Sequence, residues 1–99
     1  MTSTPTPKVR AVGVDLQDTG EESSQLVDSI VADNAGAEVT RLPGLVRVQA
    51  PAVLTIRRET VERHLGRDWE THEFQMAIVS YFGHIKEWDD DEIVIKWDH

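Results

Sequence analysis

The segment from Glu73 to Ile85 reads EFQMAIVSYFGHI, and the fold prediction starts from it. It carries no charged residue between Phe74 and Phe82, although 28% of the chain is charged. Apolar and polar residues do not alternate cleanly in it, so it does not predict a strand with one solvated face. It is also too short to cross a membrane. Both of its faces must therefore be covered, either by this fold alone or partly by another protein.

The sequence before this segment predicts a helix between two strands. Thr19 to Glu22 match a capping box, and apolar residues at helical spacing continue the helix to about Asn34. The strand-like runs Val9–Asp15 and Ala37–Leu42 flank it, so the three segments indicate a βαβ unit. The apolar stripe of the helix consists of Leu26, Val27, Ile30 and Val31.

The remaining elements complete an α+β domain with a mixed or antiparallel sheet and two to three helices. Two short alternating strands are expected to form a half-buried antiparallel pair. A short helix ending at Gly66, a helical turn and a C-terminal hairpin follow. In order, these elements are Leu45–Ala50, Val53–Arg58, a helix from Glu59 or Thr60, a turn near Thr71–Gln75, and strands His84–Trp88 and Glu92–Trp97.

Composition limits the possible functions. A chain of 99 residues predicts one domain, with residues 1–7 (MTSTPTP) as a polar tail and residues 8–99 as the folded part. The net charge of −8 argues against nucleic-acid binding; it fits either steering toward a basic protein surface or plain solubility. The chain contains no cysteine and no signal-peptide pattern, so we expect a cytoplasmic protein.

The sequence predicts neither catalysis nor a metal or cofactor site. It has no glycine-rich phosphate loop, no GxSxG and no HExxH. The acidic turn Asp89–Asp91 could suggest calcium, but it lacks the spaced ligands and closing Glu of a calcium loop, which favours a solvated turn. His64 on its short helix is more simply structural than a metal ligand.

The order and spacing of several motifs resemble the small effector, or regulatory, proteins of soluble bacterial di-iron monooxygenases. This family includes proteins of the phenol hydroxylase, toluene monooxygenase and methane monooxygenase systems. The resemblance covers about nine-tenths of the chain, from about Val9 to the end. The motifs are VDLQD (14–18), ADNAGAEV (32–39), PGLVRVQAP (43–51), LTIRRETVERHLGRDW (54–69), EFQMAIVSYFGHI (73–85) and DDDEIVIKW (89–97).

The resemblance implies a non-catalytic protein without metal, flavin or iron–sulfur cluster. Such effectors bind the hydroxylase component near its di-iron site and couple electron input to oxygen activation. The resemblance therefore implies that residues 8–99 form an effector domain, that a di-iron hydroxylase is the partner, and that the free protein is a monomer. The motif VDLQD and the acidic turn look closer to the phenol and toluene types, which leans toward an aromatic or alkene substrate.

The resemblance also implies which residues face the hydroxylase. The expected contacts lie just before and at the glycine of the uncharged segment, and Asn34 at the end of the first helix is a second candidate. Asn34 could equally cap that helix. Alternation along a strand would place Val79 and Tyr81 outward when Ile78, Ser80 and Phe82 point inward. The expected hydroxylase-binding residues are Ala77, Val79, Ser80, Tyr81, Phe82, Gly83 and Asn34.

Two functions stay open at this point. The first is the non-catalytic monooxygenase effector just described. The second is a free-standing α+β ligand-binding or regulatory module that associates with itself through the uncharged strand. The two differ in whether the purified protein forms a concentration-dependent dimer.

Overall fold

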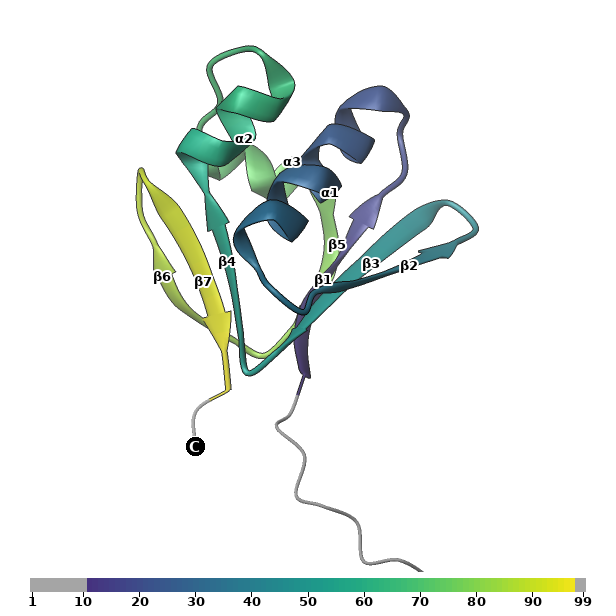
Figure 1. Ribbon diagram of the computed structural model, residues 1–99, viewed down its shortest axis with the longest axis vertical. Coiled ribbons are helices and arrows are strands. Elements are labelled where there is room, and N and C mark those ends of the chain that lie inside the picture. The colour runs from purple at the N-terminus through teal and green to yellow at the C-terminus, as the bar shows by residue number, and fades with distance from the viewer. Residues whose placement is uncertain (1–10, 98–99) are drawn as a thin grey trace, which may run out of the picture.

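The computed structural model describes residues 11–97, which form two antiparallel sheets with helices packed between them (Figure 1). The predicted tail of residues 1–7, and Val9 and Arg10 of the predicted first strand, lie outside this range. In the first sheet the order is β2-β3-β1-β5, with β1 (Ala11–Gln17), β2 (Glu38–Leu42), β3 (Leu45–Pro51) and β5 (Ile78–Phe82). In the second it is β4-β7-β6, with β4 (Val53–Arg57), β6 (His84–Trp88) and β7 (Glu92–Lys96).

The helices confirm the predicted α+β class. They are α1 (Glu21–Asp33), α2 (Arg58–Leu65), the 3₁₀ turn η1 (Thr71–Glu73) and the short α3 (Phe74–Ala77). Figure 1 shows the two sheets splayed in a V, with α1 and α2 across its wider end. The short helix ends at Gly66, which has a φ of 73° and ends α2 in the left-handed conformation that glycine favours.

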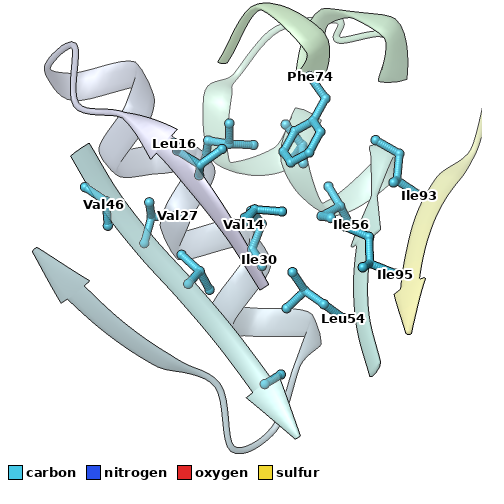
Figure 2. Close-up of a cluster of buried hydrophobic side chains, with 14 of the residues drawn as sticks. Val14, Leu16, Val27, Ile30, Val46, Leu54, Ile56, Phe74, Ile93 and Ile95 are labelled. Carbon is cyan, nitrogen blue, oxygen red and sulfur yellow. The ribbon is translucent and has the colours of Figure 1, made fainter. Parts of the chain in front are cut away.

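The hydrophobic core fills the space between the two sheets (Figure 2). Alternate residues of the strands point into it because side chains in a strand alternate between faces. The stripe of α1 closes it, although Val31 is exposed, so the stripe is narrower than the sequence predicts. Each buried aliphatic side chain contributes about 1.5 to 3 kcal/mol relative to exposure. Buried members include Val14, Leu16, Val27, Ile30, Val46, Leu54, Ile56, Phe74, Ile93 and Ile95.

The predicted pairing of the strands around Pro51 and Ala52 is wrong. β3 pairs with β1 and β2 in the first sheet, whereas β4 pairs with β7 in the second. Ala52 between them has a φ of 70°, which is uncommon for a residue with a side chain. The chain therefore bends sharply at Ala52 and passes from one sheet to the other instead of forming a hairpin.

Two further predictions need correction. The first is the βαβ unit formed by β1, α1 and β2. Both strands lie in the same sheet, but β3 runs between them, so the unit is split. Every strand pairing in the described range is antiparallel. The N-terminal cap of α1 also differs from the predicted capping box. Gly20 is the N-cap, and the Oγ of Ser23, not Glu22, accepts the N–H groups of Thr19 and Gly20, each at 3.1 Å.

Candidate functional site

β5 is an edge strand with an unpaired outer side. It pairs with β1 alone, and no other strand among residues 11–97 continues the sheet beyond it. An edge strand exposes backbone N–H and C=O groups that can pair with another chain, and soluble proteins usually protect such edges with charges. β5 has no charged residue, so its edge lacks this protection.

An exposed apolar patch lies along this edge. Met76 is 79% exposed, Val79 54% and Tyr81 48%, and together they form what we call the edge patch. It holds three of the seven exposed large hydrophobic side chains in the described part of the chain. Exposed apolar side chains gathered in one segment are candidates for an interaction site.

The other predicted residues of the segment divide between two environments. Ala77 is half-buried against the core as the last residue of α3, so the segment is not a strand throughout. Alternation alone would suggest that Ser80 and Phe82 point into the core when Val79 and Tyr81 point outward. In the structure they do not. The strand register sets them beside Asp15 and Gly13, on the outer face of the sheet.

Ser80 and Phe82 lie on the outer face because the pairing of β1 and β5 is irregular. The register shifts between Asp15 and Leu16, so Leu16 pairs with Ile78 whereas Asp15 pairs with Ser80. Ile78 packs against the core and Val79 is the extra residue at the shift. A bulge of this kind redirects the side chains that follow it.

Asp15 is a buried carboxylate at the centre of the outer face. It is 6% exposed, and its Oδ1 accepts a hydrogen bond from Nε of Arg47 at 2.8 Å. Its Oδ2 accepts from Nη2 of Arg47 at 3.1 Å and from the hydroxyl of Ser80 at 2.9 Å. The bonds from Arg47, with a smaller contribution from Ser80, outweigh burial and hold the pKa of Asp15 below its ordinary value.

Acidification is therefore expected to destabilise the wild type more than Asp15→Asn. A carboxyl group with a lowered folded-state pKa adds stability above its unfolded-state pKa of about 3.9, and this contribution is lost as the pH falls through the folded value. Urea unfolding from about pH 7 down to about pH 2.5 measures the effect. The stability difference between the two proteins should shrink below about pH 4; profiles that stay parallel would contradict the prediction.

Phe82 lies over Gly13 on the same face. A Cβ built at Gly13 would lie 2.6 Å from Cζ of Phe82 and 2.5 Å from the carbonyl oxygen of Val48, so the glycine permits a close approach. The guanidinium carbon of Arg47 lies 5.4 Å from the ring centroid of Phe82, within cation–π range.

Asn34 is buried, and its amide is used within the fold. Its Nδ2 donates to the carbonyl oxygens of Ile30 and Thr55, each at 2.7 Å, and its Oδ1 accepts the N–H of Thr55 at 2.8 Å. These bonds tie the C-terminal end of α1 to β4. Of the two roles left open by the sequence, the geometry favours the structural one, and Asn34 offers little surface to a partner.

Asn34→Ala is expected to lower the free energy of unfolding by about 2 kcal/mol, because the N–H of Thr55 loses its partner. The loss should appear in urea unfolding. Exchange of Asp28 for Asn, an exposed position on the same helix, serves as a control and should change stability by less than about 0.5 kcal/mol. A similar loss in both variants would contradict the buried role of Asn34.

Sequence reasoning missed Met76, Asp15 and Arg67. Met76 lies two positions after the buried Phe74 in a helical turn, a spacing that puts the two side chains on different faces. Arg67 donates hydrogen bonds to Glu22 of α1 and Glu73 of η1, at 3.0 and 3.3 Å. These ion pairs border a cavity of about 230 Å³ that Met76 also lines.

The polar residues that could suggest metal binding have other partners. Nδ1 of His64 lies 2.9 Å from the carbonyl oxygen of Thr60. Oδ1 of Asp89 accepts the N–H groups of Asp91 and Glu92, which favours the solvated turn. Within residues 11–97, no group of three or more His, Asp or Glu side chains is arranged to hold a metal ion.

None of the helices among the described residues has the length and apolar character needed to cross a membrane.

Comparisons with known proteins agree over most of the chain. The MmoB/DmpM family model matches residues 10–96. DmpM, the stimulatory component of phenol 2-monooxygenase from Pseudomonas sp. (strain CF600), is 38% identical over 77 residues, which are 78% of this chain and 84% of that protein.

Solved structures extend the comparison to three dimensions. A chain from a phenol hydroxylase–regulatory protein complex superposes with a TM-score of 0.82 at 36% identity and covers 90% of this chain and 100% of that one. A second structure of such a complex gives 0.78 at 34% identity, covering 89% and 100%. The regulatory protein B of soluble methane monooxygenase, at 15% identity and a TM-score of 0.69 over 97% of this chain and 71% of that one, shares the fold.

Proposed function

The chain belongs to the MmoB/DmpM family, and from this premise we propose that it is the non-catalytic regulatory component of a multicomponent di-iron monooxygenase. The observation that carries the proposal is its 38% identity to a stimulatory component of phenol 2-monooxygenase. The close superposition on a chain from a phenol hydroxylase–regulatory protein complex supports a hydroxylase as the partner. An aromatic substrate of the phenol type fits the same relatives, and we also propose a cytoplasmic location.

The edge patch is the surface through which we propose that the protein docks. Tyr81 is an aromatic anchor on a strand, and Val79 and Met76 extend the apolar area around it. Ala77, Ser80, Phe82 and Gly83 belong to the same segment of the chain. Aromatic and methionine side chains are enriched at the centres of interfaces, where they fill pockets of the partner.

Docking would act on the hydroxylase by shifting its conformational equilibrium. A regulator that binds an active hydroxylase conformation more tightly raises the population of that conformation by its difference in affinity. The net charge of −8 would speed association with a basic rim around the docking site. Electron transfer and oxygen chemistry then belong to the other components.

The test is a titration of this protein into a purified phenol-type di-iron hydroxylase supplied with its reductase and NADH. Product formed per NADH consumed should rise and reach a plateau near one regulator per hydroxylase active site. An unchanged ratio would contradict the proposal. Sedimentation of the free protein at micromolar concentration separates the alternative, because a self-associating module would form a concentration-dependent dimer through β5.

A further inference from the structure

We propose that Asp15 is a positioning residue that holds β5, through Ser80, in the conformation that presents the edge patch. This inference rests on the proposed function for its effect on docking, whereas the anchoring itself can be tested without a partner. Asp15 lies on β1, Ser80 on β5 and Arg47 on β3, so one carboxylate joins three neighbouring strands.

The carboxylate of Asp15 accepts hydrogen bonds from both neighbouring strands. The bidentate pair with Arg47 fixes the position of both carboxylate oxygens, because the planar guanidinium binds them through two N–H groups. Oδ2 then accepts the hydroxyl of Ser80 at 2.9 Å. Each partner stands directly opposite Asp15 in the strand register.

β5 needs such an anchor more than the inner strands do. In the described range it has one neighbouring strand, and its pairing with β1 is interrupted next to Asp15. An extra residue at a bulge disrupts the regular ladder of backbone hydrogen bonds. The bond from Ser80 spans the two strands at this interruption, and Ser80 lies between the exposed residues Val79 and Tyr81 in the chain.

Asp15 acts through Ser80 and not by direct contact. At 6% exposure it offers almost no surface to a partner, whereas Val79 and Tyr81 are about half exposed. Removal of Asp15 should therefore change how often β5 adopts the docking conformation. A smaller competent fraction raises the apparent dissociation constant in proportion. The stimulation reached at saturation should stay the same.

The anchoring is tested by amide hydrogen exchange on the isolated protein. A hydrogen bond to a charged group is worth about 1.5 to 3 kcal/mol, so Ser80→Ala should speed exchange of the amides of residues 78–82 by about tenfold or more. Amides of β3 should change by less than about twofold, since the pair between Asp15 and Arg47 remains. Asp15→Asn should speed exchange of residues 78–82 by a similar factor, and it should also speed exchange in β3, because it removes the ion pair with Arg47. Ser80→Thr, which keeps a hydroxyl, should exchange like the wild type.

The effect on docking is tested by titration of each variant into the same phenol-type hydroxylase. Asp15→Asn and Ser80→Ala should each raise the half-saturating concentration about tenfold at unchanged maximal stimulation, and Ser80→Thr should restore the wild-type value. Because Ser80→Ala keeps the ion pair between Asp15 and Arg47, it reports on the hydrogen bond from Ser80 even when Asp15→Asn does not fold.

The outcomes separate the two proposals. Failure of the wild type to stimulate the hydroxylase rejects the proposed function, and the exchange data still decide the anchoring. Unchanged exchange in residues 78–82 in both variants overturns the inference. A docking defect in Ser80→Ala with a folded and unaffected Asp15→Asn also overturns it, because Ser80 would then contact the hydroxylase directly. Faster exchange without a change in half-saturation overturns the positioning role.

Discussion

Gly83→Ala is expected to lower the free energy of unfolding by about 3 to 5 kcal/mol, a large part of the stability of a small domain. Gly83 joins β5 to β6 with a φ of 123°, a conformation that side chains rarely tolerate. A Cβ there would also lie 2.8 Å from Cγ2 of Ile95 and 3.0 Å from Cγ1 of Val12, both in the core. Strain and overpacking therefore add up at this position.

Gly20→Ala is the matched control, measured like Gly83→Ala by urea unfolding. Gly20 has a φ of 121°, close to that of Gly83, but no atom lies within 4 Å of its built Cβ. This variant should report the backbone strain alone, at about 1 to 2 kcal/mol. Equal losses in the two variants would mean that the core yields around the added methyl group. A large stability loss in Gly83→Ala would also show that the fold itself requires Gly83, which the sequence predicts as a docking residue.

Tyr81→Ala should raise the concentration of this protein needed for half-maximal hydroxylase stimulation by about 10- to 100-fold. Buried aromatic anchors at interfaces contribute about 1 to 3 kcal/mol or more when truncated to alanine. The free protein should lose less than about 1 kcal/mol of stability, because Tyr81 is about half exposed on an edge strand. Titration of the variant and urea unfolding of the free protein measure the two effects.

Leu42→Ala is the control for Tyr81→Ala. Leu42 is 40% exposed and lies in β2, at the opposite edge of the same sheet. It should lose a similar amount of stability and leave the titration unchanged within about twofold. Equal weakening by the two variants would place the docking surface elsewhere or spread it over the whole sheet. A stability loss of several kcal/mol in Tyr81→Ala would assign Tyr81 to the core.

Local features of the fold could be predicted from the sequence because their causes are local. Helical spacing of apolar residues located α1, and a glycine at the right place located the end of α2. Ile93 and Ile95 of β7 lie two positions apart, so alternation puts them on one face, and both are fully buried. Strand pairing could not be predicted in this way, because it depends on contacts between segments that are distant in the sequence. Nothing in the sequence around Ala52 signals its positive φ, so the separation of β3 from β4 could not be predicted.

The candidate site shows the same division. The lack of charge between Phe74 and Phe82 correctly drew attention to an exposed segment. The bulge beside Asp15 and the four-residue helix α3 decide which side chains face outward. A pattern of alternating residues predicts neither feature. Met76 was therefore missed, and alternation alone could not place Ser80 and Phe82 on the outer face. Their hydroxylase contacts stay a prediction, whereas the geometry of Asn34 favours its structural role.

The attachment of β5 at both ends has a thermodynamic consequence for association. Residues 78–82 follow α3 directly and continue through one glycine into β6, so the segment has little conformational entropy left to lose when a partner arrives. Ordering of loops and side chains is a main cost of complex formation, and a preorganised surface avoids most of it. Calorimetry of the complex should therefore show a negative heat-capacity change that matches the apolar area covered, without the larger value that accompanies coupled folding.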